Sequence, residues 1–197
     1  MEVLPVDLPK LLSSSSHSQQ EIASRISQAH HLSVSMKRGS EQLLAKYVHF
    51  QGRPFGDADF NPPYPAFPGL PSPSLPHETW KDLSDAERLQ QNVTAFSNLP
   101  EFLSAVKRQQ ESVNPHASEL HRQLETAGLK CRGLASNLKS VMTAMGLAPA
   151  PAPPAEPPNP VDIFPKKLIG YYVCQLYRDW ANRSEDDLAL LATKYPL

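Results

Sequence analysis

The sequence predicts an all-α protein: a bundle of four long helices in up-up-down-down order, joined by two long crossover loops. Four segments repeat apolar residues at helical spacing, and no alternating run is bounded by hairpin turns. Fifteen of the 21 prolines fall in residues 53–80 and 147–162. Because proline removes a backbone donor and clashes with the preceding turn, these two stretches are predicted to be crossover loops.

The first helix is predicted over residues 19–51. Ser18 and Glu21 form a capping box, which satisfies two backbone amides at a helix start. Gly52 can adopt the left-handed conformation that ends a helix, and Pro54 prevents continuation. The predicted core face repeats at 4-3-4-3 spacing and consists of Ile22, Ile26, Ala29, Ser33, Met36, Ser40, Leu43 and Tyr47.

The second helix is predicted over residues 85–111. It opens with another capping box, Ser84 with Glu87. Pro100 lies inside it and is expected to kink it, at a cost of about 3 kcal/mol if nothing compensates. The apolar face consists of Leu89, Val93, Phe96, Leu99, Leu103 and Val106.

The third helix is predicted over residues 115–145 and the fourth over residues 163–194. Asn114 is expected to cap the third helix, with Pro115 at its first position. Pro165 is tolerable in the first turn of the fourth. The third helix has the cleanest stripe: Leu120, Leu124, Ala127, Cys131, Leu134, Leu138, Val141 and Met145. The fourth carries Ile169, Val173, Leu176, Trp180, Leu188 and Leu191.

Connection lengths set the predicted topology. Helices of about 30 residues are about 45 Å long, whereas the three-residue gap after the second helix reaches only about 10 Å. The second and third helices must therefore be antiparallel neighbours. The other two connections have 28 and 16 residues, and even the shorter reaches about 50 Å in polyproline geometry. Two helical hairpins joined by disordered linkers are the alternative, but each hairpin alone would expose much of its apolar stripe.

Composition indicates one domain, residues 18–195, preceded by a disordered leader over residues 1–17. A net charge of −1 gives no reason to expect nucleic acid or an anionic membrane as partner. Basic residues of the third helix, among them Arg132 and Lys139, are interpreted as a solvated face. No run approaches 18 apolar residues, and the N-terminus lacks a hydrophobic signal core, so the residues alone do not predict a conventional secretory precursor.

The sequence contains no constellation of catalytic or metal-binding residues. It has no phosphate-binding loop, no HExxH and no Glu-x-x-His pair. Cys131 and Cys174 lie on helices that are diagonal in the predicted bundle, too far apart for a disulfide, so both are predicted to be free. We therefore expect neither enzymatic activity nor a cofactor.

Six stretches of the chain resemble the cardiotrophin family of interleukin-6 cytokines. The resemblance spans residues 18–195, and its most specific part lies in the fourth helix. It is carried by YVHFQG followed by PF in 47–55, FNPP in 60–63, LSDAERLQ in 83–90, FPKK in 164–167, VCQLYRDW in 173–180, and DLALL followed by KY in 187–195. It implies the long-chain four-helix cytokine bundle.

The resemblance also implies a function. Such a cytokine is secreted, and it bridges glycoprotein-130 and the leukaemia inhibitory factor receptor to trigger JAK–STAT signalling. Some members add ciliary neurotrophic factor receptor alpha. The protein would be a monomer that is cytoplasmic in the producing cell and leaves it by an unconventional route, without a signal peptide. Glycoprotein-130 would bind exposed faces of the first and third helices. An intracellular helical scaffold or lipid-binding bundle is the alternative, which a response to protein added outside cells would exclude.

The family pattern Phe-x-x-Lys at the start of the fourth helix maps onto Phe164 and Lys167, which implies contact with the leukaemia inhibitory factor receptor. Three residues apart, both project from one face of the first turn. An exposed aromatic can act as a binding hot spot, and a lysine adds charge complementarity. The alternative is that Phe164 packs against its own bundle as a helix-start staple.

A second pattern, Arg-x-x-x-Asp, maps onto Arg183 and Asp187 near the surface implied to face the alpha receptor. The alternative for this pair is an ordinary surface salt bridge worth about 0.3–0.5 kcal/mol.

Overall fold

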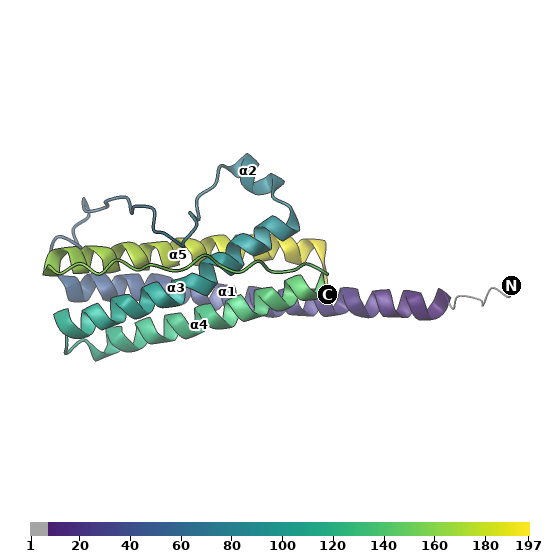
Figure 1. Ribbon diagram of the computed structural model, residues 1–197, viewed down its shortest axis with the longest axis horizontal. Coiled ribbons are helices and arrows are strands. Elements are labelled where there is room, and N and C mark those ends of the chain that lie inside the picture. Colours follow the sequence, from purple (N-terminus) through teal and green to yellow (C-terminus); the bar gives the residue numbers. More distant parts are fainter. Residues whose placement is uncertain (1–7) are drawn as a thin grey trace.

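The computed structural model describes residues 8–197, with side chains from residue 18 onward. Figure 1 shows four long helices in one bundle and one short helix standing away from it. Within the described residues there is no strand, as predicted. The helices are α1 (Leu8–Gln51), α2 (His77–Asp82), α3 (Asp85–Val113), α4 (Ser118–Ala144) and α5 (Ile163–Lys194).

Helix packing confirms the up-up-down-down order. Helix α1 packs against α4 and α5, and α3 packs against the same two helices. Side-chain contacts give the directions: Lys46 near the end of α1 lies 3.1 Å from Glu119 at the start of α4. Likewise, the α3 residue Lys107 lies 3.3 Å from Glu125 of α4. Helices α1 and α3 therefore run parallel on one diagonal, and α4 and α5 occupy the other.

The predicted apolar stripes form one continuous core. Every predicted core-face residue of α1 and α3 is buried, including the polar Ser33 and Ser40. These two serines fit because their hydroxyls donate to carbonyls of their own helix, at His30 (2.7 Å) and Lys37 (2.8 Å). Met145 and Ile169 are only partly buried, since they lie at the ends of their helices.

The start of α1 corrects the sequence-based boundary. The helix begins at Leu8 rather than at residue 19, so the prediction of a disordered leader is wrong for residues 8–17. Residues 1–7 lie outside the described part of the chain. The backbone can continue through Ser18 because no proline or glycine follows Pro9 until Gly39. Pro9 itself stands in the first turn, where a missing amide hydrogen costs nothing.

The start of α4 also differs from the prediction. Asn114 ends α3 instead of capping the next helix: its backbone amide donates to Gln110 O, and its side-chain amide donates to Gln110 Oε1 at 2.8 Å. The same amide donates to Gln51 Oε1 at 3.3 Å. Because its side chain bonds to α3 and α1, Asn114 does not cap the next helix. The chain turns through residues 115–117, and α4 begins at Ser118, not at 115.

Both crossover loops lie close against the bundle. The Asn98 side chain of α3 donates to Gly69 O in the first loop and to Pro153 O in the second, each at 2.7 Å. The second loop follows α3 from Gln90 to Gln109, contacting their side chains through Ala150 and Pro158. Eight steps along the loop chain thus span 19 steps along the helix, about 28 Å, which requires a nearly extended chain such as the polyproline conformation.

The first crossover loop, residues 52–84, carries the short helix α2, which the sequence reading placed partly within the irregular stretch 53–80. Gly52 has φ 77°, as predicted for a left-handed helix end. Several hydrogen bonds fix the loop to α5: among them, Tyr64 donates to Asp179 Oδ2 at 2.6 Å, and Trp180 Nε1 donates to Pro71 O at 2.8 Å. Its path is therefore defined by specific side chains.

Cys131 and Cys174 are both free and fully buried, as predicted from their diagonal helices. Burial raises the pKa of each thiol well above its usual value, because the low-dielectric core disfavours the thiolate.

Gly170 of α5 lies against the Tyr47 side chain of α1. A methyl group there would lie 2.1 Å from the Tyr47 hydroxyl, which donates to Lys167 O at 2.6 Å. Since the Tyr47 side chain is fully buried, it cannot move aside to make room for the methyl group. We expect Gly170→Ala to lower the free energy of unfolding by about 3 kcal/mol, the upper end of overpacking costs, measured by urea denaturation.

Gly128→Ala on α4 is the matched control for this prediction. A methyl group at Gly128 meets no atom within 4 Å, so this variant is expected to stabilise the helix by about 0.5–1 kcal/mol. Equal effects of the two substitutions would contradict close packing at Gly170.

Candidate functional site

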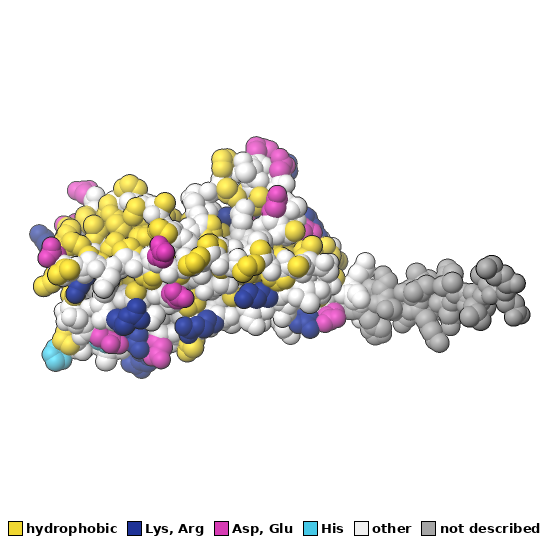
Figure 2. Space-filling view, viewed as in Figure 1, with side chains coloured by type: hydrophobic (Ala, Val, Ile, Leu, Met, Phe, Trp, Pro, Cys, Tyr) yellow, Lys and Arg dark blue, Asp and Glu magenta, His cyan; other side chains and the backbone are white. Residues whose placement is uncertain are grey.

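The first turn of α5 and the residues before it expose an unusual amount of apolar surface. Of the six large exposed hydrophobic side chains among residues 18–197, three lie here: Val161 is 88% exposed, Ile163 is 63% and Phe164 is 49%. Figure 2 shows the surrounding area, over the first crossover loop and the N-terminal part of α5, as the broadest hydrophobic region on that face. Exposed apolar surface concentrated at one place is typical of a protein-binding site.

The Phe164 ring packs against other aromatic rings of the protein. Its ring centroid lies 5.8 Å from that of Phe55 in the first crossover loop, and Phe55 is only 3% exposed. Phe55 in turn contacts Phe60 at 5.2 Å and Tyr171 at 5.6 Å. The aromatic cluster therefore supports one face of Phe164, while about half of the side chain stays accessible to a partner.

Lys167 lies one turn further along the same face of α5. Its ammonium donates to the Gln51 carbonyl oxygen at 3.1 Å, at the C-terminal end of α1, where the helix dipole favours a cation. No acidic side chain within residues 18–197 lies at ion-pair distance from it. The predicted pair, Phe164 and Lys167, thus forms one surface at the end of the bundle where α1 stops and α5 starts.

Arg183 and Asp187 differ from the expectation that they lie on the surface. Arg183 is 7% exposed and Asp187 only 1%. They form the expected i,i+4 pair, with Arg183 Nε 3.3 Å from Asp187 Oδ2. Burial lowers the pKa of Arg183, and the Asp187 carboxylate opposes that shift. A surface salt bridge is therefore the wrong description, because the first crossover loop and α3 cover the pair.

Asp187 is the centre of a buried polar network. Its carboxylate accepts from Arg88 Nη1 at 2.8 Å, from Trp80 Nε1 at 2.6 Å and from Asn92 Nδ2 at 2.7 Å. Arg88, 0% exposed, also donates to the Trp80 carbonyl and lies over the Trp80 ring at 4.7 Å. Arg183 Nη2 donates to Gln91 Oε1. The network thereby joins α2, α3 and α5.

The sequence reading missed four members of this network: Trp80, Arg88, Gln91 and Asn92. One signal was present, because Arg88, Asn92 and Phe96 follow each other at four-residue spacing and continue the core-facing stripe of α3. Trp80 gave no comparable signal, since its position depends on the path of the crossover loop. The network brings the predicted Arg183 and Asp187 together, but about 24–35 Å along α5 from Phe164 and Lys167.

An up-up-down-down bundle of helices this long, with two crossover loops, defines the long-chain helical cytokines. A family model described as "Plethodontid receptivity factor PRF" matches residues 12–196. The chain is 38% identical to cardiotrophin-1 of Mus musculus over 179 residues, covering 86% of each protein. It is 38% identical to cardiotrophin-2 of Mus musculus over 175 residues, covering 86% of this chain and 84% of that protein. Ciliary neurotrophic factor of Sus scrofa is 28% identical over 155 residues, 77% of this chain and 74% of that protein.

The chain therefore belongs to the cardiotrophin family of interleukin-6-type cytokines. This confirms the resemblance described above. As a member of that family it is a cytokine and not an enzyme, as predicted. Within residues 8–197, no helix combines the length and the apolar character needed to cross a lipid bilayer.

Proposed function

We propose that this cytokine is secreted and bridges two receptor chains, glycoprotein-130 and the leukaemia inhibitory factor receptor, to activate JAK–STAT signalling. Phe164 and Lys167 form the contact with the leukaemia inhibitory factor receptor. The observation that supports this assignment is the half-exposed Phe164 ring on its aromatic support, surrounded by exposed Ile163 and Val161. An immobilised aromatic side chain can fill a partner pocket with little loss of conformational entropy.

Glycoprotein-130 is proposed to bind the outer faces of α1 and α4. These two helices pack directly against each other, so their outer faces form one continuous surface. Separate surfaces on one rigid bundle let each receptor chain be held at the same time. Proximity of the attached kinases then starts signalling inside the responding cell.

Ciliary neurotrophic factor receptor alpha is the proposed third partner. Arg183 and Asp187 would act here as positioning residues, because they are too buried for direct contact. Their network fixes α2, which carries Trp80, and the adjoining end of α5. The exposed surface of α2 and α5 would then be the one that this receptor recognises.

Purified receptor ectodomains test the arrangement. We expect the chain to bind glycoprotein-130 and the leukaemia inhibitory factor receptor each in a 1:1 complex and both together in a ternary complex, measured by analytical ultracentrifugation. Protein added outside cells that express both receptors should raise STAT phosphorylation with dose. The absence of a ternary complex and of any response would contradict the proposed function and favour an intracellular scaffold.

A further inference from the structure

A basic groove lies on the bundle away from the Phe164 surface. It has a volume of about 780 Å³ and is lined by residues of α1, α3 and α4. In Figure 1, α3 and α4 diverge toward the N-terminal end of α3. The groove is lined on α3 by Phe96 and Ser97 and on α4 by residues between Arg132 and Ala144. Its cationic side chains are Arg25 of α1 and Arg132 and Lys139 of α4. Its only acidic lining residue is Glu21, so the groove carries a formal charge of about +2 in a chain whose net charge is −1.

The cations of α4 are not neutralised by the protein. Glu21 accepts from Arg25 at 2.8 Å, whereas no acidic side chain in residues 18–197 lies within ion-pair distance of Arg132 or Lys139. Seven residues apart, Arg132 and Lys139 project from one face of the helix, about 10 Å apart along its axis. Two separate charges are therefore available to two anionic groups of one ligand.

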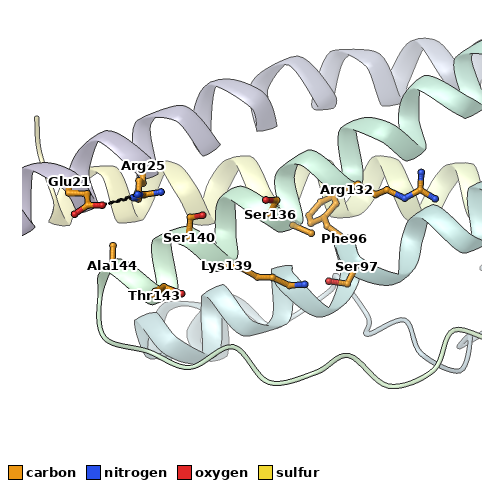
Figure 3. Close-up of a pocket in the computed structure, with 11 residues that line it drawn as sticks. Glu21, Arg25, Phe96, Ser97, Arg132, Ser136, Lys139, Ser140, Thr143 and Ala144 are labelled. Atoms are coloured by element: carbon orange, nitrogen blue, oxygen red, sulfur yellow. Dashed lines mark hydrogen bonds and ion pairs between the residues drawn. The ribbon is translucent and has the colours of Figure 1, made fainter.

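Hydroxyl groups line the groove beside these charges. Ser136, Ser140 and Thr143 of α4 line the groove at helical spacing, and Ser97 faces them from α3. The Ser97 hydroxyl oxygen is buried and has no hydrogen-bond partner among the described residues. Figure 3 shows the Ser97 hydroxyl and the Lys139 ammonium pointing toward one another across the groove. A small movement of the flexible lysine side chain would aim both donors at one ligand oxygen.

The lining also indicates which polyanion fits. Membrane-surface binding requires exposed apolar side chains beside the cations, and none of the large exposed hydrophobic residues lines this groove. Phe96 and Ala135 give the groove a small apolar surface, against which the apolar face of a sugar ring can pack. From Arg132 to Thr143 the lined stretch of α4 extends about 16 Å, which suits a short oligosaccharide chain better than a single anion.

We propose that the groove binds a sulfated polysaccharide of the cell surface, with Arg132 and Lys139 each holding a sulfate. The choice of an extracellular polyanion rests on the proposed function, in which the chain acts outside cells. The groove lies on α1, α3 and α4 near Arg25, whereas Lys167, one turn from Phe164 on α5, contacts Gln51 at the C-terminal end of α1. A bound polysaccharide would retain the cytokine at the cell surface and leave the Phe164 surface accessible.

Binding to an immobilised heparin dodecasaccharide, measured by surface plasmon resonance in 0.15 M NaCl, tests this proposal. We expect Arg132→Gln with Lys139→Gln to weaken binding at least about tenfold, because two charge-assisted contacts are lost. Ser97→Ala should weaken it about threefold or more, because one hydrogen bond to a sulfate oxygen is lost. Both cations are exposed, so the double variant should keep the melting temperature of the parent chain.

The matched control removes the same charge from the same helix outside the groove. Arg122→Gln with Lys130→Gln changes residues that line a different depression on α4 and should change affinity less than about twofold. Equal loss in the two double variants would show non-specific attraction and overturn the proposal. Equal binding of the desulfated and the sulfated dodecasaccharide would also overturn the proposal. Binding to phosphatidylserine vesicles that is lost in the Arg132→Gln/Lys139→Gln variant would overturn it as well.

Receptor binding separates this proposal from the proposed function. The oligosaccharide assay contains no receptor, so its result stands whether or not the ectodomains bind. Loss of glycoprotein-130 binding in Arg132→Gln/Lys139→Gln, with unchanged oligosaccharide binding, would instead assign the groove to a protein partner and overturn the proposal.

Discussion

Replacing Asp187 by alanine is expected to lower the free energy of unfolding by about 3–5 kcal/mol, the cost of removing one partner from a buried ion pair. Asp187 is 1% exposed and accepts hydrogen bonds from Arg88, Trp80 and Asn92. Without its carboxylate, two guanidinium groups remain buried with no opposite charge between them, and three donors lose their acceptor. Urea denaturation followed by circular dichroism measures the effect.

Glu185→Ala is the control for the removal of a carboxylate from the same helix. The Glu185 side chain is 23% exposed and lies 3.6 Å from His30 Nε2, so its loss should cost less than about 1 kcal/mol. A double-mutant cycle adds a second test. Arg88→Ala combined with Asp187→Ala should cost at least about 1 kcal/mol less than the sum of the single variants. Additive costs would contradict a coupled network.

Replacing Phe164 and Lys167 together by alanine is expected to weaken binding to the leukaemia inhibitory factor receptor by at least about 30-fold. Loss of a single hot-spot side chain costs about 2 kcal/mol or more, and Phe164 presents about half of its side chain to solvent on a fixed support. STAT phosphorylation in responsive cells should fall accordingly. Binding of the purified receptor ectodomain is the direct measurement.

Folding should survive this double substitution. Phe164 is half exposed, and Lys167 contributes one hydrogen bond to the end of α1, so the loss of stability should be about 1–2 kcal/mol. Leu129→Ala is the matched control, because Leu129 is 59% exposed but lies on α4. It should leave this receptor's affinity unchanged. Normal binding by the Phe164/Lys167 variant would show that another surface makes the contact.

Helix boundaries show where reading the sequence failed. The Ser18–Glu21 capping box predicted a helix start, yet α1 runs through it from Leu8. A capping box stabilises a helix end but does not prevent helical residues before it. Similarly, Asn114 before Pro115 has the sequence pattern of a helix N-cap, but its side chain donates hydrogen bonds to Gln51 and Gln110 instead. In both places, local preference was too weak to decide between two permitted conformations.

The positions of the candidate residues in the fold were predicted with uneven success, for a physical reason. Phe164 and Lys167 lie where helix periodicity and the family pattern placed them, on one face of the first turn. Arg183 and Asp187 were paired correctly but expected on the surface. Spacing of i,i+4 puts two side chains on the same face and says nothing about what covers that face.

The sequence by itself determined the four helices, the left-handed end of α1 at Gly52, and the order of directions in the bundle. These follow from helical periodicity, from the inability of proline to continue a helix, and from the reach of each connection, which are local properties of the chain. Only the tertiary structure decided that Asp187 is buried beneath Trp80 and Arg88, which are 107 and 99 residues away in sequence. The charge environment of a side chain depends on whatever folds over it, and that partner can come from any part of the chain.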